Sequence, residues 1–583
     1  MRIIHTSFLR DCVVAIVLLI GITSYAFAGQ TYLYRSEATQ KYFQNANGDY
    51  AKVLDAWRGF ATRENLALKE VDQSKIKALK PDDVLVLPSV MLMTEVEKTA
   101  IDSFVAKGGA LLATWASGGR DVKGEWLGYQ WLKRMFDIDI VADIRQTSEE
   151  RFLLPYGENL ATSQLPAGKR MYLLKTAEPL LRAKGKYSIA RYGDWTRSTH
   201  TPFASTSAIT ASEIKGARRI WIGAPEGSWA GAQSDMDKVL KDLLAWLHRQ
   251  PTVTLASWPA PFQTAFFVEM DTEDKFENAA VLEKIFDDRG LRGSFYLLTS
   301  LAMKHPELVK RLAVKHDIGF HADIHNGFKG LSAEQQDVRI RKMIADLKQI
   351  IWENNRAIGF RAPLESYDKT TEITLRSRGI RLHVADPGSS DSSLPFFSTS
   401  EPGLSSDQAL LVMPRTLLDD INYQQMGISK PGSVKQVLFE NLQDKVMSRG
   451  LGLLSVHTQN FASESILARE VAGLLDEALR LRNKVWLPSG DQIDAWWRGR
   501  ARVQLTHTRL ANGHIAVSVG NAGSVDMPST QLIVTAPSFE SNLVISPAVP
   551  GLQVTRQDDL RWAVSLPVLK AGASAKFTAR FVK

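Results

Sequence analysis

The sequence predicts an α/β protein of several domains that ends in a small all-β domain. The chain has 583 residues, which gives room for about three to four domains. Residues 30–250 and 255–500 alternate apolar runs of strand length with amphipathic runs of helix length, whereas residues 501–583 show only short strand-like runs. A hydrophobic content of 44% and a charged content of 23% are ordinary for proteins with large cores.

The first 28 residues have the pattern of a secretory signal peptide. Arg2 and Arg10 precede the apolar stretch Val13–Ile22, and Ala26–Ala28 is a small-x-small cleavage pattern. We therefore expect residues 1–28 to be removed and the mature protein to be periplasmic or secreted. A retained membrane anchor is the alternative, although the apolar run is short for a membrane span.

Cysteine content and charge exclude several classes of function. Cys12 is the only cysteine and lies in the expected signal peptide, so the mature chain has no disulfide, thiolate ligand or cysteine nucleophile. The net charge of +8 is compatible with an anionic polymer or a membrane surface as neighbour. No basic run carries interleaved aromatic residues, so we do not expect a nucleic-acid partner.

Residues 30–250 are expected to form an open parallel sheet with helices on both faces. Asp83–Leu87 and Arg219–Gly223 have the apolar character of buried strands, and Glu95–Val105 and Asp235–Leu247 have helical patterns. The stretch from about 150 to 215 is mixed in pattern and is expected to include an insertion.

The same region resembles the flavodoxin-like class I glutamine-amidotransferase fold, especially in Asp83–Leu87 and Phe104–Leu112. Active members of that family carry a cysteine on the sharp turn after a strand. The comparable turn here, Ala116–Gly119, has no cysteine. The resemblance therefore implies a non-catalytic domain over residues 30–250, with Ser117 as nucleophile being the alternative.

Residues 255–500 are expected to form a second α/β domain. Leu282–Asp288 and Glu307–Lys315 have helical patterns, and Gly293–Leu298 between them has the pattern of a strand. Ser332 and Gln335 form a capping box that begins a long helix reaching about residue 353.

In the last 80 or so residues the apolar side chains recur with a period of two, as in β-strands. Arg502–Leu505 and His514–Val519 flank the turn Asn512-Gly513 and are expected to form a hairpin. Further short strand patterns follow, so residues 501–583 are expected to form a small immunoglobulin-like sandwich.

An acidic cluster and two histidines in the second α/β region have the composition of a metal site. The cluster is Asp271-Thr272-Glu273-Asp274, and His321 and His325 are four residues apart, so they can share one ion. One carboxylate and two imidazoles leave a position open for water, as catalytic sites do, and a spare carboxylate can act as a base. The alternatives are acids that cap a helix and histidines that are structural.

A further histidine ends an apolar strand-like run. His457 follows Leu453–Val456, and α/β barrels place catalytic groups at the carboxyl ends of their strands. His457 is therefore a candidate general acid for a leaving group.

These residues occur within five motifs that resemble, in order and across about 240 residues, the NodB-type polysaccharide deacetylases (carbohydrate esterase family 4). The first four are Asp271–Asp274, His321–His325, Arg361–Pro363 and the segment from Asp386 to Asp391; the fifth is Leu454–His457. The first motif departs from the usual Thr-Phe-Asp-Asp-Gly, and the fourth lacks its tryptophan. The resemblance implies a distorted (β/α) barrel of NodB type.

The resemblance also implies residue roles. The implied metal ligands are Asp274, His321 and His325. Arg361 would hold the catalytic carboxylate, Asp391 would support Arg361, and His457 would protonate the departing amine. The base remains open between Glu273, which aligns with the first aspartate of the usual doublet, and Asp271, which fits a variant spacing.

The function implied is metal-dependent removal of N-acetyl groups from a polysaccharide in the cell envelope, with zinc as the default divalent metal. An O-acetyl esterase and a peptidoglycan deacetylase are alternatives that use the same site. A degenerate deacetylase that serves as a polysaccharide-binding or export scaffold is a third. The expected partners are a polysaccharide and membrane-bound machinery for polysaccharide synthesis or export.

Overall fold

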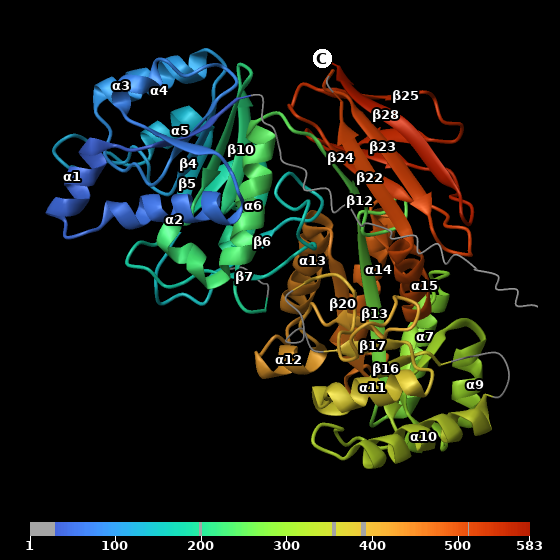
Figure 1. Cartoon of the computed structure of the whole chain (residues 1–583). Helices are drawn as coiled ribbons and strands as arrows, with labels where there is room; N and C mark the ends of the chain where they lie inside the picture. The colour runs from blue at the N-terminus through green and yellow to red at the C-terminus, as the bar shows by residue number, and fades with distance from the viewer. Residues whose placement is uncertain (1–28, 197–200, 352–356, 386–391, 511, 583) are drawn as a thin grey trace, which may run out of the picture.

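The structure is a computed structural model. It describes residues 29–196, 201–351, 357–385, 392–510 and 512–582. The expected signal peptide and Asp391 lie outside these ranges. Within the ranges, no helix combines the length and the hydropathy that crossing a membrane requires. Figure 1 shows an N-terminal α/β part, a central α/β part and a C-terminal part made of strands.

The N-terminal part is built on a nine-stranded sheet. Across the sheet its strands are β2 (Leu68–Val71), β1 (Thr31–Tyr34), β3 (Val84–Leu87), β4 (Ala110–Thr114), β11 (Ala217–Ile222), β10 (Ile209–Ile214), β9 (Tyr187–Gly193), β6 (Phe152–Pro155) and β7 (Met171–Tyr172). The first five are parallel, as expected. The expectation is wrong for the other four, which pair antiparallel.

Helices cover both faces of this sheet, as the strand–helix alternation predicts. One face packs against α2 (Tyr50–Arg63) and α6 (Gln233–Leu247), and the other against α4 (Glu95–Ala106) and α5 (Gln130–Phe136). The remaining elements are the helices α1 (Glu37–Asn45) and α3 (Gln73–Ile76) and the paired strands β5 (Ile138–Ile144) and β8 (Leu180–Gly185).

The central part is a curled sheet whose long strands are parallel. Its order is β18 (Phe396–Phe397), β19 (Leu411–Pro414), β17 (Leu382–Ala385), β16 (Gly359–Arg361), β15 (Asp317–Ala322), β14 (Ser294–Leu298), β13 (Thr264–Thr272) and β20 (Leu451–His457), with β21 (Val485–Trp486) also paired to β13. Of the strands that the structure describes in this sheet, only β18 is antiparallel to its neighbour. Among the described residues, strand pairing does not close the sheet. Thr416 Oγ1, just after β19, instead donates to the carbonyl of Leu451 and accepts from the backbone N–H of Leu453 in β20.

One apolar core lies between the central sheet and most of the helices around it, and a second joins the other side chains of the sheet to the helix Gly490–Ala501 and the C-terminal strands. The helices are α7 (Ala279–Asp287), α8 (Thr299–Ala302), α9 (Pro306–Lys315), α10 (Ala333–Ile350), α11 (Lys369–Ser377), α12 (Asp420–Gln425), α13 (Pro431–Ser448), α14 (Ile466–Arg480) and α15 (Gly490–Ala501). The capping box expected at Ser332 and Gln335 is confirmed at the start of α10. Because the packed strands are parallel, their carboxyl ends lie together at one edge of the sheet.

The C-terminal strands form two four-stranded sheets. One contains β22 (Val503–Arg509), β23 (Ile515–Asn521), β28 (Ser574–Val582) and β25 (Asn542–Ser546), so the predicted hairpin is confirmed. The other contains β12 (Thr252–Leu255), β24 (Gln531–Thr535), β27 (Arg561–Ser565) and β26 (Gln553–Arg556). Strand β12 comes from the segment before the central part, which the sequence did not indicate. An immunoglobulin-like topology remains a prediction.

The buried carboxyl group of Asp317, at the start of β15, makes stability depend on pH. Burial and then the charge of Asp491 raise the pKa of Asp317 to about 7. A carboxyl whose pKa is raised by folding stabilises the fold below its unfolded pKa, and this contribution is lost as the pH rises through about 7. Asn in its place can still accept the Ser294 hydroxyl hydrogen bond, which is 3.0 Å long.

Asp317→Asn is therefore expected to gain stability relative to the wild type, by about 2–4 kcal/mol between about pH 4 and pH 8. Urea titrations of both proteins across this range measure the difference. Asp526→Asn, which changes a surface ion pair with Lys570, is the control. A difference between Asp317→Asn and wild type that does not change with pH would contradict the prediction.

Candidate metal and catalytic site

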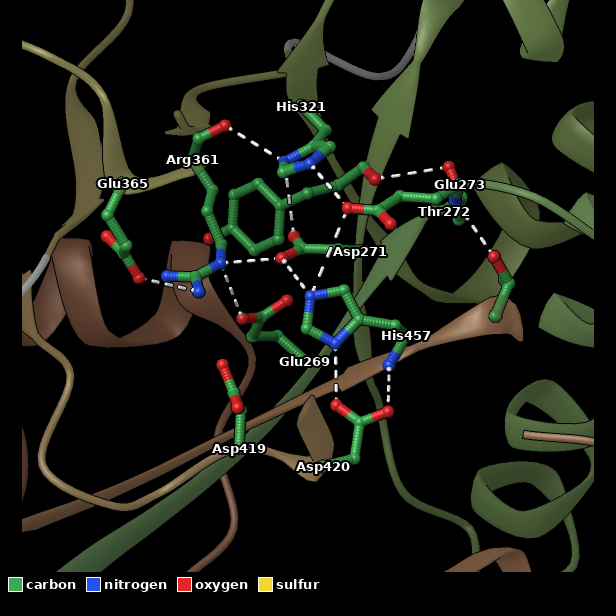
Figure 2. A network of polar contacts seen from close by, with 12 residues as sticks. Glu269, Asp271, Thr272, Glu273, His321, Arg361, Glu365, Asp419, Asp420 and His457 are labelled. Atoms are coloured by element: carbon green, nitrogen blue, oxygen red, sulfur yellow. Dashed lines mark hydrogen bonds and ion pairs between the residues drawn. The ribbon is translucent and has the colours of Figure 1, made fainter. Parts of the chain in front are cut away.

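The predicted site residues meet at the carboxyl edge of the central sheet. Asp271 lies near the end of β13, His321 near the end of β15, Arg361 at the end of β16 and His457 at the end of β20. The register of β13 and β20 places Asp271 directly beside His457. Figure 2 shows these side chains pointing toward one another.

Glu273, His321 and His325 form a group that fits one metal ion. Their ligand atoms lie within 4.8 Å of one another. Glu273 Oε1 is 3.1 Å from His321 Nε2 and 2.8 Å from His325 Nε2. These separations are close to those between neighbouring ligands of one tetrahedral ion.

The hydrogen bonding of His321 supports the same fit. Its Nδ1 lies 3.1 Å from the carbonyl oxygen of Arg361, which can only accept, so Nδ1 carries a proton. In the neutral ring, Nε2 then has a lone pair that faces the Glu273 carboxylate. Two electron-rich groups facing one another in a partly buried site need a cation between them or a proton on the ring.

Asp274 is not part of this group, in contrast to the ligand set that the family motif implies. Its side chain is exposed, and its backbone carbonyl accepts a hydrogen bond from Thr458. Strand β13 continues through Thr272, and side chains in a strand alternate between faces. Asp271 and Glu273 therefore share the face toward the histidines, and Asp274 does not.

Glu273 is held as an anion in this position. Burial opposes ionisation, but the hydrogen bonds with His321 and then His325 keep the pKa of Glu273 well below its usual range. Its other oxygen accepts a 2.6 Å hydrogen bond from Gln459. The sequence offered Glu273 as a base, whereas its geometry is that of a metal ligand.

Asp271 has the surroundings of a general base. It is 1% exposed, and its Oδ2 lies 2.7 Å from Arg361 Nε and 3.6 Å from His457 Nε2. Burial raises the pKa of Asp271, but the charges of His321, Arg361 and His457 outweigh burial and lower it. The carboxylate is therefore ionised and ready to accept a proton.

Arg361 is buried among three carboxyl groups. In addition to Asp271, it lies 3.3 Å from Glu269 Oε1 through Nε and 2.8 Å from Glu365 Oε1 through Nη2. Burial, followed by the charge of Asp271, raises the pKa of Glu269 well above its usual value, so Glu269 is neutral. The sequence analysis assigned no role to Glu269 or Glu365. The support expected from Asp391 falls outside the described residues.

Removing the Arg361 charge is expected to destabilise the central part. Arg361→Met leaves the buried carboxylate of Asp271 without this cation, which costs about 3–5 kcal/mol. Urea unfolding measures the loss, and Glu269→Gln is the matched control because Glu269 is already neutral. A variant Arg361→Met as stable as Glu269→Gln would contradict this account.

His457 is held as a proton donor by Asp420, a residue that the sequence analysis missed. His457 Nδ1 lies 2.6 Å from Asp420 Oδ1, and Asn460 donates to the other oxygen of Asp420. Burial lowers the pKa of His457, but the hydrogen bond with Asp420 and its charge raise the value to about 10. The opposite ring nitrogen, Nε2, faces Asp271 and Glu273.

The metal-fitting group, Asp271, Arg361 and His457 line one cavity of about 240 Å³. Its lining includes Asp271, Glu273, His321, His325, Arg361 and His457. Leu364 on its rim is 73% exposed, and Arg415 in its wall is paired with Asp419 at 2.6 Å. The cavity therefore brings a base, an acid and a metal-fitting group within reach of one small substituent.

Residues 272–383 match the family model of polysaccharide deacetylases. Over these residues the chain is similar to polysaccharide deacetylases. The match supports the resemblance for the motifs that lie within these residues, His321–His325 and Arg361–Pro363. We refer to the central part as the deacetylase domain.

The amidotransferase-like resemblance of the N-terminal part is not confirmed. Residues 33–249 match a different family model, that of the β-galactosidase trimerisation domain.

Among solved structures, the chain is similar to several of deacetylase type. One is a probable polysaccharide deacetylase from Pseudomonas aeruginosa, with 15% identity, 42% of this chain and 94% of that chain covered, and a TM-score of 0.36. Another is Agd3, a carbohydrate deacetylase, with 11% identity, 95% and 99% covered, and a TM-score of 0.40. A third is a pseudoenzyme of carbohydrate esterase family 4 from Bacillus anthracis, with 10% identity, 40% and 66% covered, and a TM-score of 0.28. No curated protein matches the chain.

Proposed function

We propose that the deacetylase domain hydrolyses the N-acetyl groups of a polysaccharide and that Glu273, His321 and His325 hold a divalent metal for this reaction. One observation carries the proposal: an ionised carboxylate, a protonated imidazole and a metal-fitting group share one cavity of about 240 Å³. The match of residues 272–383 to polysaccharide deacetylases supports the same reaction.

Asp271 and His457 each carry out one of the two proton transfers of the reaction. A divalent cation held by Glu273, His321 and His325 would supply Lewis-acid polarisation of the acetamide carbonyl and would acidify water. Asp271, oriented by Arg361, accepts the proton of the attacking water. His457, oriented by Asp420, gives the Nε2 proton to the departing nitrogen. The C–N bond breaks, and the products are acetate and a free amino group on the sugar.

Acetate release from defined glycans tests the substrate class. Zinc-loaded protein is expected to release acetate from N-acetylglucosamine oligomers and not from O-acetylated xylan. Release from the xylan alone would replace the proposal with an esterase. If metal-loaded protein released acetate from neither, the scaffold alternative would be favoured.

We also propose that the reaction takes place in the cell envelope, next to machinery that makes or exports the polymer. The support is the signal-peptide pattern, in which Arg2 and Arg10 precede Val13–Ile22 and Ala26–Ala28 follows. Amino-terminal sequencing of the protein recovered from the envelope tests this, with Gly29 as the expected first residue. An N-terminus that still carries Met1 would contradict cleavage.

A further inference from the structure

A second, larger hollow lies in the N-terminal part, at the carboxyl ends of its parallel strands. We call it the switch-point crevice. Its volume is about 700 Å³, which is in the range of ligand sites. Its lining includes Arg35, Glu37, Lys41, Tyr42, Asp72 and Lys123.

The strand order explains why a crevice forms there. Strands β1 and β3 are neighbours, but the chain leaves β1 toward β2 on one side and leaves β3 toward β4 on the other. Arg35 directly follows β1, and Asp72 directly follows β2. In open α/β sheets, ligands bind outside the carboxyl ends of the strands at such a reversal of direction.

The polar groups of the crevice suit a ligand rich in hydroxyl groups. Its lining has three cations, Arg35, Lys41 and Lys123, and three carboxylates, so neither an anion nor a cation is favoured overall. Within the described part of the chain, these three cations form no ion pair. Hydroxyl groups can accept from them and donate to carboxylates such as Glu37.

An aromatic surface borders the same crevice. The guanidinium of Arg120 lies 5.2 Å from the ring centre of Tyr42, which lines the crevice, and 5.5 Å from that of Trp126. Arg120 also donates to the carbonyl of Gly124 in the lining. Trp126 remains 48% exposed, so part of its ring is free to pack against the C–H face of a sugar.

We propose that the switch-point crevice binds a stretch of the neutral polysaccharide chain, with Trp126 as the stacking surface. This rests on the proposed function, because that function supplies a polymer as ligand. Figure 1 shows α1, which contributes Glu37 and Lys41, at the end of the N-terminal part away from the deacetylase domain. The crevice would therefore hold the polymer at a second point, apart from the unit being deacetylated.

Calorimetry with full-length protein tests the binding. The starting protein carries His321→Ala, so that the ligand is not consumed, and the probes are the hexamers of N-acetylglucosamine and of glucose. Adding Trp126→Ala or Arg35→Ala is expected to weaken binding of at least one hexamer by roughly tenfold. Trp195→Ala is the matched control, because Trp195 is 61% exposed in the same part of the chain, but neither it nor its neighbour Arg170, which donates to its carbonyl, lines the crevice.

Two results would overturn the proposal. One is that Trp126→Ala and Trp195→Ala weaken hexamer binding equally, or that neither of them weakens it. The other is a marked preference for polygalacturonate that disappears at high salt, which would indicate an anion site.

Activity separates this proposal from the proposed function. In otherwise wild-type protein, Trp126→Ala should leave kcat/KM unchanged on the dimer of N-acetylglucosamine and lower it by roughly tenfold on the long polymer. Absence of acetate release by the wild type would contradict the proposed function. Hexamer binding that depends on Trp126 would still support the crevice in that case.

Discussion

Glu273→Gln is expected to remove the bound metal and to lower acetate release by about three orders of magnitude, whereas Asp274→Asn leaves both close to wild type. Glu273 Oε1 is the atom that lies 2.8–3.1 Å from both histidine nitrogens. Gln keeps the shape of the side chain but replaces the anionic ligand atom with a neutral one. Asp274, one residue further along, is exposed and does not approach the histidines.

The pair of variants is matched, because each exchanges a carboxylate for its amide at neighbouring positions. Metal content is measured by mass spectrometry after dialysis, and acetate release is measured on the same samples. The reverse pattern, with metal lost from Asp274→Asn and kept in Glu273→Gln, would restore the ligand set implied by the family motif. It would also show that β13 ends differently from the structure described here.

His457→Gln is expected to lower kcat by about 10²–10⁴-fold on an N-acetylated sugar, because the departing amine then lacks its proton donor. Asp420→Asn should act in the same direction but less strongly, because Asp420 acts by orienting the His457 ring. For both variants, the loss of kcat should be much smaller on p-nitrophenyl acetate, because the leaving group of this substrate needs no proton.

The ratio of the two activities is therefore the measurement that identifies the role of His457. His305→Gln is the control, since His305 stacks on Phe276 at 5.0 Å and does not line the cavity. An equal loss on both substrates would show that His457 acts before the leaving group departs. In that case the assignment of the proton donor would be wrong.

The histidines of the site are predictable from sequence for a physical reason. His321 and His457 each end a run of apolar residues of strand length, and the carboxyl ends of parallel strands meet at one edge. Arg361 ends β16 in the same way. A local pattern therefore suffices for the two histidines, whereas Arg361 was indicated only by the family motif Arg361–Pro363.

Other parts of the site depend on contacts that no local pattern carries. Asp420 reaches His457 across 37 residues, and its position depends on how α12 follows β19. The choice between Glu273 and Asp274 depends on where the pleat of β13 ends, which an acidic cluster does not reveal. Glu269 is hidden in an apolar run. It lies two residues before Asp271, however, so the alternation of side chains in a strand could have placed both carboxyl groups on the same face.

The same distinction between local patterns and long-range contacts applies to the fold. The parallel half of the N-terminal sheet follows from strand–helix alternation, but the antiparallel half includes β9 and β6, from the mixed stretch between 150 and 215. The hairpin of β22 and β23 follows from the Asn512-Gly513 turn. The pairing of β12 with β24 joins residues about 280 positions apart, so no local sequence pattern indicates it.

That pairing makes the deacetylase domain an insertion within the C-terminal strands. The chain passes through β12, runs through the whole deacetylase domain, and returns to the same pair of sheets at β22. The entry and exit of the domain are thus both anchored, so it cannot swing on a single linker. Cutting the chain after residue 501 would remove the partner of β12 and expose a strand edge, so a shortened enzyme should keep the C-terminal strands to remain soluble.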